Sequence, residues 1–539
     1  MKRICSIALG ILVLSSCKEN TKTSGPISEE TLKKHIVALS SDAFEGRKPF
    51  THGEEMTLAY LKEEAKKIGL QPGNGDSFTQ DVPLTEISGH PSETMELIGP
   101  KSLSLKLRDQ YVVFTQRPVA EINLSGSDLV FCGYGIVAPE YNWNDYEGLD
   151  MKGKTALVLV NDPGLGGEDS TFFKGSTMTY YGRWTYKYEE AARQGASGIL
   201  IIHESNMAGY PWAVVQGAGS GAKLNLNSLG YTPCEMQGWV SLDAAKEIFS
   251  TAGLDLQSNM MAARKPGFKA VPLPYKVTAG IKNEIRTNVS KNVVAMIPGT
   301  DQKDEYIIFS AHWDHLGIGA VVDNDSIYNG ARDNSTGSAA LLAIAEAMVK
   351  EGPYKRSIVF LWVTAEEQGL LGSAYYAANP IFPPAKTVAN INIDGMAAYG
   401  EMNDLSIIGY GQSEMETYAA RAAEQQNRYI LPDQEPEKGY FFRSDHFNFA
   451  KIGIPALYAH GSFDHRTKGK EYAKEKSDEY RSTAYHLPAD EYIEGTFELS
   501  GILQDATLFY IVAKELANTK DWPKWKEGSE FKAIREASK

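Results

Sequence analysis

From residue 292 onward, short apolar runs alternate with a helical segment, and this rhythm limits the chain to a small set of folds. The runs 306–311, 357–363 and 388–393 are rich in Ile, Val and other apolar residues, as buried strands are. Between the first two, apolar residues recur at helical spacing over 338–349. Strands that alternate with helices favour a mostly parallel central sheet with helices on both faces. We therefore predict an α/β fold for this part of the chain.

The sequence before residue 292 predicts the first part of the α/β domain and a second unit inserted into it. Helical spacing over 27–39 and 53–68 is followed by residues with strand-like alternation up to about residue 122. Further strands and one helix then stand among loops rich in Gly and aromatic residues. A chain of 539 residues is long enough for two to four domains. The predicted units are a signal peptide (1–16), a tether (17–26), the first part of the α/β domain (27–122), an inserted β-rich domain (123–274), the rest of the α/β domain (275–518) and a loosely packed C-terminal tail (519–539).

The first residues predict export. Met1–Arg3 is positively charged, 4–14 is apolar, and Leu14–Cys17 resembles a bacterial lipobox. So short an apolar stretch is typical of a signal peptide, because a membrane-spanning helix needs about 20 apolar residues. We expect cleavage before Cys17, lipidation of that residue, and anchoring in the cell envelope, at the outer membrane or facing the periplasm. Simple secretion with cleavage nearby is the alternative. Contact with a membrane is expected only through the lipid.

Composition narrows the possible functions. The formal charge of −14 argues against nucleic acid as a partner, because phosphate binding requires a basic face. Four cysteines in a chain of this length cannot form a disulfide scaffold. Two of them, Cys132 and Cys234, fall in the inserted unit, where a disulfide and two buried free thiols are both consistent with the sequence. An enzyme or a binding protein with a substantial core is therefore expected.

Side chains with metal-ligand chemistry follow the predicted strands or precede the predicted helix, and one more stands far along the chain. In sequence order they are His312 and Asp314, Asp333, Glu366 and Glu367, Asp394, and His486. Each alone is weak evidence, but their ordered occurrence at strand-to-loop junctions is not expected by chance. Imidazole and carboxylate groups suit zinc. Two ions about 3.5–4 Å apart, with one carboxylate bridging them, can hold a hydroxide and polarise a carbonyl group.

The adjacent pair Glu366 and Glu367 is the most informative part of this set. Two neighbouring glutamates usually lie on a solvated helix face. Here one carboxylate would bind metal while the other takes a proton from the attacking water and delivers it to a leaving amine. The pair therefore favours hydrolysis.

These residues, in this order, resemble the co-catalytic zinc peptidases, a family that includes bacterial leucyl-type aminopeptidases and glutamate carboxypeptidases. The most specific stretches are 292–317, 329–342, 365–373, 392–396, 444–456 and 485–490. The interval 123–274 looks like the protease-associated (PA) domain often inserted in this family, and 39–47 looks like secreted bacterial members that carry the insert. The resemblance implies a zinc aminopeptidase-like fold, two co-catalytic Zn²⁺ ions and peptide substrates.

Carried over residue by residue, the resemblance implies a role for each member of the set. One zinc would be held by His312 and Asp394, the other by Glu367 and His486, with Asp333 bridging both. Glu366 matches the general base, and Asp314 matches the carboxylate that orients His312. Tyr485 matches a phenol that donates a hydrogen bond to the developing oxyanion. Arg332 departs from the family's usual Asp or Asn but is not a ligand position.

Other polar residues near these motifs keep two interpretations. His315 is expected to support the site more than to bind metal. Asp445 and His446 either support the site or belong to a helix start capped by Ser444. Asp490 either supports His486 or caps the next turn.

We expect an exopeptidase that releases N-terminal residues through a metal-bridging hydroxide, with Glu366 as general base. Acidic neighbours at a metal site attract a free α-amino group. A glutamate carboxypeptidase is the second choice, because it should need several arginines near the pocket and only Arg443 is an obvious candidate. A non-catalytic receptor-like relative and a glutaminyl cyclase are remote alternatives, since the full ligand set and Glu366 are present. The sequence leaves the oligomeric state and the preferred terminal residue open.

Overall fold

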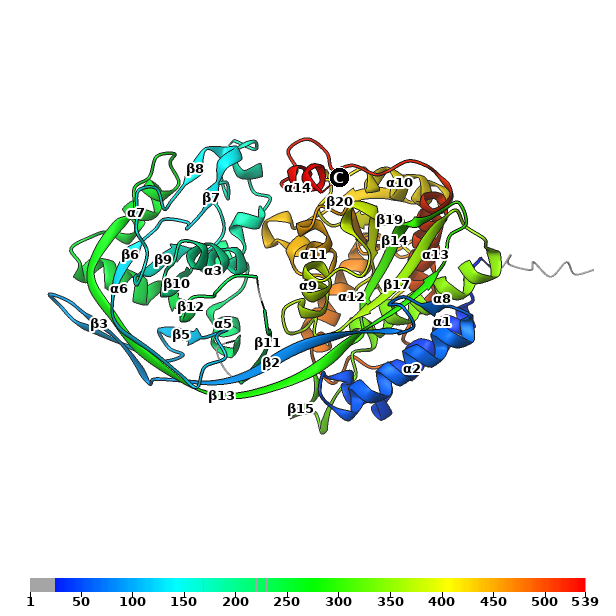
Figure 1. Cartoon of the computed structure of the whole chain (residues 1–539), viewed down its shortest axis with the longest axis horizontal. Helices are drawn as coiled ribbons and strands as arrows, with labels where there is room; N and C mark the ends of the chain where they lie inside the picture. Colours follow the sequence, from blue (N-terminus) through cyan, green and yellow to red (C-terminus); the bar gives the residue numbers. More distant parts are fainter. Residues whose placement is uncertain (1–24, 168, 219–220, 229, 539) are drawn as a thin grey trace, which may run out of the picture.

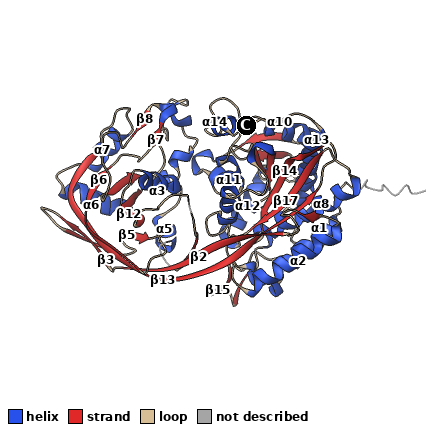
Figure 2. Ribbon diagram, in the orientation of Figure 1, coloured by secondary structure: helices blue, strands red, loops and turns tan. Residues whose placement is uncertain are grey.

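A computed structural model describes residues 25–167, 169–218, 221–228 and 230–538. The expected signal peptide, Cys17 and nearly all of the tether lie outside the described residues. The chain forms two lobes connected by two long strands, β2 (Thr79–Pro91) and β13 (Val271–Ile297) (Figure 1). The first lobe carries most of the helices and the second lies at the other end of the long strands (Figure 2).

The first lobe is built on a sheet whose centre is parallel. Strand β14 pairs in parallel with β17 and with β18, and β18 pairs in parallel with β21. Strand β13 flanks β17 in the antiparallel direction, and β19 does the same at β21. The strands of this lobe besides β2 and β13 are β1 (Gln71–Pro72), β14 (Gln302–His312), β15 (Gly317–Val322), β16 (Asp325–Tyr328), β17 (Arg356–Val363), β18 (Thr387–Asn392), β19 (Asp404–Ile407), β20 (Tyr429–Pro432) and β21 (Ala456–His460).

Helices cover both faces of this sheet, so the predicted α/β architecture is confirmed. Alternate residues of each central strand point to opposite faces. Phe309 and Phe360 pack in a core with α1, α2, α8, α10 and α13, whereas Ile308 and Val359 pack with α9 and α11. The helices of this lobe are α1 (Glu29–Leu39), α2 (His52–Ile68), α8 (Thr336–Glu351), α9 (Leu371–Ala378), α10 (Met415–Gln425), α11 (His446–Lys451), α12 (Gly469–Thr483), α13 (Leu499–Asn518) and α14 (Lys532–Ala537).

The second lobe has its own sheet and its own cores. Strands β6, β9, β10 and β12 pair in parallel in that order, and β5 and β13 add antiparallel edges. Its strands are β3 (Thr94–Ile98), β4 (Leu103–Lys106), β5 (Tyr111–Phe114), β6 (Glu121–Phe131), β7 (Val137–Ala138), β8 (Trp143–Asn144), β9 (Thr155–Leu159), β10 (Gly198–His203), β11 (Ala222–Leu226) and β12 (Met236–Ser241). Its helices are α3 (Trp184–Arg193), α4 (Ser205–Ala208), α5 (Trp212–Ala218), α6 (Leu242–Thr251) and α7 (Leu256–Ala263).

The two long strands belong to both lobes. They pair without interruption from Val293 opposite Thr79 to Ile281 opposite Pro91. At one end of β13, Val293 packs in the core of the first lobe, and at the other end Val277 packs in the core of the second. The lobes are therefore joined by a continuous piece of sheet.

Two expected boundaries differ from the structure. Residues before 122 were expected to belong to the α/β domain, but Met95, Leu105 and Val113 pack in the core of the second lobe. The second lobe therefore begins with β3, because these strands cover its sheet. The C-terminal tail was expected to be loosely packed, but Trp525 and Phe531 are buried and pack against Phe441, Phe447 and their neighbours.

Two further points concern the chain as a whole. Cys132 and Cys234 are both buried free thiols, which decides between the two alternatives left open by the sequence. Within the described residues, no helix combines the length and the apolar character needed to cross a membrane.

Candidate metal centre

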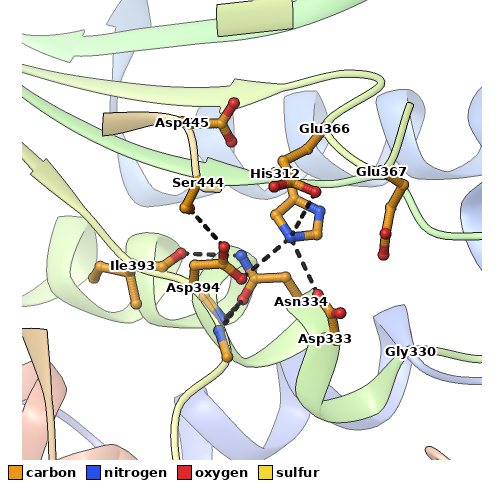
Figure 3. A network of polar contacts seen from close by, with 12 residues as sticks. His312, Gly330, Asp333, Asn334, Glu366, Glu367, Ile393, Asp394, Ser444 and Asp445 are labelled. Atoms are coloured by element: carbon orange, nitrogen blue, oxygen red, sulfur yellow. Dashed lines mark hydrogen bonds and ion pairs between the residues drawn. The ribbon is translucent and has the colours of Figure 1, made fainter. Parts of the chain in front are cut away.

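The candidate ligands meet at one edge of the first lobe's sheet. His312 is the last residue of β14, Asp394 follows β18 by two residues, and Glu367 lies in the loop after β17. The three strands run in parallel, so their carboxyl ends lie side by side, where α/β sheets bind their ligands. Asp333 comes from a short helical turn, Ala331–Ser335, directly before α8, and His486 follows α12. Figure 3 shows how His312, Asp333, Asp394 and the two glutamates face one another.

Asp333 lies between two imidazole rings and offers one oxygen to each. Its Oδ1 is 3.2 Å from Nε2 of His312, and its Oδ2 is 3.2 Å from Nε2 of His486. On the first side, Oδ1 of Asp394 is 3.3 Å from the same nitrogen of His312. On the second side, Oε2 of Glu367 is 3.1 Å from Nε2 of His486. The five side chains thus form two halves that share Asp333, which is the arrangement the resemblance implies.

The spacing of these atoms fits zinc coordination. Zinc binds nitrogen and oxygen at about 2.0–2.2 Å in tetrahedral geometry, so neighbouring donor atoms lie roughly 3.3–3.5 Å apart. The four distances in the cluster, 3.1 to 3.3 Å, come within a few tenths of an ångström of that separation. The donor atoms of His312, Asp333 and Asp394 all lie within 4.8 Å of one another. Both the donor chemistry and the geometry therefore suit divalent cations.

The electrostatics of the cluster favour positive charge. Burial lowers the pKa of His486, but contacts with Asp333 and Glu367 outweigh it and raise the value to about 10. Burial lowers the pKa of His312 as well, yet the carboxylates of Glu366 and Asp394 raise it well above its ordinary value. Buried carboxylates thus surround both rings, and a divalent cation between the same groups would satisfy the same negative charge.

The two adjacent glutamates differ in their surroundings. Glu367 is held by two imidazoles, with Oε1 2.6 Å from Nδ1 of His315 and Oε2 at His486. Burial raises its pKa, but these histidines outweigh burial and hold the pKa at about 2. The carboxylate of Glu366 lies 4.0 Å from Nε2 of His312 and has no closer ion pair among the described residues. Burial and the charges of Asp394 and Glu367 raise the pKa of Glu366 well above its ordinary value. Glu366 is thus the one suited to accept a proton.

Ser444 holds the ligand Asp394 in place. Its Oγ donates a 2.6 Å hydrogen bond to Oδ2 of Asp394 and accepts one of 2.8 Å from Nδ2 of Asn392. Ser444 was considered as a helix cap, but α11 begins at His446 with Asp445 at its N-cap, and no side chain caps it. The contact with Asp394 was not expected, because no sequence pattern links the two positions. The two residues are 50 positions apart and meet only in the folded chain.

Two aspartates support the cluster in ways that differ from expectation. Among the described residues, the carboxylate of Asp490 forms no hydrogen bond or ion pair with His486 or with the turn that follows Asp490. Its carboxylate accepts hydrogen bonds from the main-chain N–H groups of Arg332 and Asp333, both 3.0 Å long. Asp314 was expected to orient His312, but its Oδ1 is 3.8 Å from Nδ1 and instead accepts a 3.1 Å hydrogen bond from the N–H of Glu366. The main-chain oxygen of Asp314 lies 3.1 Å from Nδ1 of His312.

Of the other aromatic and imidazole side chains considered from the sequence, Tyr485 and His315 contact the cluster and His446 lies in the core. The ring of Tyr485 is half exposed and stacks on His486 with ring centres 3.9 Å apart, so it borders the open side of the cluster. His315 contacts Glu367, and donor atoms of His315, Asp333 and Glu367 all lie within 4.8 Å of one another. His446 is buried between Phe441 and Tyr458, and burial lowers its pKa to about 3. It is therefore a core histidine.

Two arginines, Arg183 and Arg443, also come close to each other, and the sequence pointed to only one of them. Arg443 directly precedes Ser444, and Arg183 belongs to the second lobe. Burial, followed by the positive charge of Arg443, lowers the pKa of Arg183 to about 10. No sequence signal identifies Arg183, because its proximity depends on how the lobes meet.

Comparison with known proteins relates the segment that holds the cluster to a family of peptidases. Residues 292–504 match peptidase family M28. Aminopeptidase NAALADL1 of Mus musculus is 33% identical over 138 residues, which cover 24% of this chain and 17% of the mouse protein. The glutamate carboxypeptidase 2 homolog of Caenorhabditis elegans is 24% identical over 440 residues, or 68% of this chain and 51% of the worm protein. The matches therefore span between about a sixth and a half of these relatives.

A solved structure, an aminopeptidase from Aneurinibacillus sp. strain AM-1, aligns over 92% of this chain and 96% of its own length, with 20% identity and a TM-score of 0.48.

Replacing Ser444 tests the support of Asp394. Ser444→Ala removes the 2.6 Å hydrogen bond and leaves Asp394 free to turn away from His312. We expect zinc affinity to fall about 10- to 100-fold, the usual cost of losing a residue that orients a ligand. Competition with a zinc chelator measures it. Ser482→Ala, on exposed helix α12, is the control. Unchanged zinc affinity in Ser444→Ala would show that Asp394 needs no such support.

Proposed function

We propose that this chain, which belongs to peptidase family M28 through residues 292–504, is a zinc-dependent exopeptidase that removes residues from the N-terminus of peptides. His312 and Asp394 would hold one zinc ion, Glu367 and His486 the other, and Asp333 both. This assignment is supported by the donor distances within each half of the cluster. Zinc bound there supplies an activated water and polarises the carbonyl group of the scissile bond.

The observation that carries the proposal is the difference between Glu366 and Glu367. Glu367 is fixed by two histidines, whereas the carboxylate of Glu366 has no ion pair closer than 4.0 Å among the described residues. A buried carboxyl group with a raised pKa accepts a proton readily and can pass it on. Glu366 takes the proton from the attacking water and delivers it to the departing amine. The N–H of Glu366 donates to Asp314, which keeps the loop that carries this carboxylate in position.

The N-terminal preference follows from charge. The cluster region contains more carboxylates than its two zinc ions require, among them Glu366 and the buried Asp445. This excess of negative charge favours a substrate with a free α-ammonium group. Tyr485, half exposed beside His486, would donate a hydrogen bond to the oxyanion that develops at the scissile carbonyl.

Replacing each glutamate separately tests this division of roles. Glu366→Gln keeps the shape of the side chain but cannot accept the proton, so we expect kcat to fall about 100- to 10,000-fold with zinc content unchanged. Glu367→Gln removes a proposed ligand and should lower zinc content as well. The measurements are zinc per chain and hydrolysis of peptides with free and with blocked amino termini. Wild-type activity in Glu366→Gln would remove it from the role of base, and cleavage of blocked peptides alone would exclude an aminopeptidase.

A second candidate, a glutamate carboxypeptidase-like activity, gains support from Arg183 and Arg443. Arg183 is only 9% exposed, and the Nε atoms of both guanidinium groups are buried without a partner. Neither side chain has an ion pair with a carboxylate among the described residues. Two neighbouring cations of like charge, one buried and the other half-buried, suit a substrate carboxylate, which would pair with both. The worm relative named above carries the corresponding activity in its name.

Arg183→Met distinguishes the two activities. If the pair binds a substrate carboxylate, we expect KM to rise about tenfold or more for peptides with a free C-terminus and to stay the same for their amides. Arg193→Met is the matched control, because Arg193 is the last residue of α3, the helix that Arg183 precedes, and already pairs with Glu190. An equal effect on both kinds of peptide would mean that Arg183 binds no terminal carboxylate.

The second lobe is proposed to be the protease-associated domain and to border the substrate cleft. Met178 packs against Phe441 and Phe442, and Lys451 pairs with Glu189 at 3.1 Å. The loop contacted in this way leads directly to Ser444. A border of this kind would restrict the size of the substrate.

We also propose that the protein is a lipoprotein of the cell envelope, anchored through Cys17. The support is the positive start, the short apolar stretch and the sequence before Cys17. Metabolic labelling with a radioactive fatty acid should mark the wild type and leave Cys17→Ala unlabelled. Labelling of both, or of neither, would contradict the assignment.

A further inference from the structure

Arg47 is a buried arginine that donates only to main-chain oxygens. It is 1% exposed and forms no ion pair with a carboxylate among the described residues. Its Nε donates to the oxygen of Trp313 at 2.9 Å, and its Nη2 donates to that of Gly330 at 3.0 Å. Its Nη1 donates to Leu39 at 2.6 Å and to Asn329 at 2.5 Å. One guanidinium group thus joins three separate segments of the chain.

Two of these segments carry proposed zinc ligands. Trp313 directly follows His312, and Gly330 lies three residues before Asp333. In addition, the N–H of His315 donates to the main-chain oxygen of Arg47 at 3.4 Å. Arg47 therefore connects the loop that follows His312 to the loop that precedes Asp333.

The backbone around Arg47 is shaped for this approach. Glu45, Gly46 and Arg47 have φ angles of 47°, 63° and 52°, all in the left-handed region. A Cβ atom on Gly46 would lie 2.4 Å from the oxygen of Tyr328, so only glycine allows the turn to come this close. Nδ2 of Asn329 returns the contact by donating to Oδ1 of Asp42 at 2.8 Å. The turn that carries Arg47 and the loop before Asp333 therefore each donate a hydrogen bond to the other.

The guanidinium group also lies in the field of the acidic cluster. Burial lowers the pKa of Arg47 to about 10, while the charges of Asp314, Asp490 and Asp333 oppose that effect. The side chain therefore stays charged at neutral pH. The planar fork of an arginine supplies five donors in fixed directions, whereas a lysine offers three from one point.

We propose that Arg47 is a positioning residue that sets the spacing between the His312 loop and the Asp333 loop, so that both zinc ions find their ligands already in place. This inference rests on the zinc site of the proposed function. It concerns a residue that touches neither the ligands' side chains nor the substrate.

Replacing Arg47 by lysine keeps the positive charge but removes the planar guanidinium group with its five donors. We expect Arg47→Lys to bind zinc at least tenfold more weakly than wild type, measured by chelator competition, because one ammonium group cannot reach all four oxygens. Arg47→Met should show a loss at least as large. Zinc should also raise the midpoint of thermal unfolding by less in both variants than in wild type.

Arg535→Lys is the matched control. Arg535 is 4% exposed and donates to the oxygens of Pro384 and Thr387, at 2.6 and 2.8 Å, at the opposite end of β18 from Asp394. We expect its zinc affinity to equal that of wild type even if its unfolding midpoint falls. Wild-type zinc affinity in Arg47→Lys, or an equal loss in Arg535→Lys, would overturn the inference. Failure of the wild type to bind zinc would instead overturn the proposed function.

Discussion

The burial of carboxylates at a single edge of the sheet is the constraint on which the rest of the structure depends. Asp314, Asp333, Glu366 and Glu367 all lie close to His312, and their side chains are at most 10% exposed. Like charges in a poorly solvated site repel one another strongly, so such a cluster is stable only when cations or protons lie between its members. The supporting contacts around the site are hydrogen bonds either to the carboxylates themselves or to main-chain groups close to the ligands.

These supporting contacts come from different directions and from distant parts of the sequence. Ser444 holds Asp394, Asp490 binds the N–H group of Asp333, and Asp314 binds that of Glu366. Arg47 donates hydrogen bonds to the main-chain oxygens of Trp313 and Gly330. None of these groups needs to touch a metal ion, yet each limits where a ligand can move. The preorganisation of the cluster is therefore a property of the whole edge of the sheet.

The sequence predicted the parts of this arrangement that depend on local patterns. Apolar runs mark strands, and parallel strands bring their carboxyl ends together, so the meeting of His312, Glu367 and Asp394 could be expected. The contact of Ser444 with Asp394 and the approach of Arg183 to Arg443 could not, because they depend on how loops and lobes fold back on one another. The buried positions of Trp525 and Phe531 were missed for a related reason. Their segment is polar, and two aromatic anchors spaced six residues apart produce no periodic signal.

The shared strands β2 and β13 have a consequence for movement between the lobes. A flexible linker would let the second lobe swing freely, but here the connection is an unbroken antiparallel ladder from Thr79 to Pro91. Bending such a ladder stretches several hydrogen bonds at once. The ladder therefore limits how far the second lobe can swing relative to the first, and with it how far Arg183 can move away from Arg443.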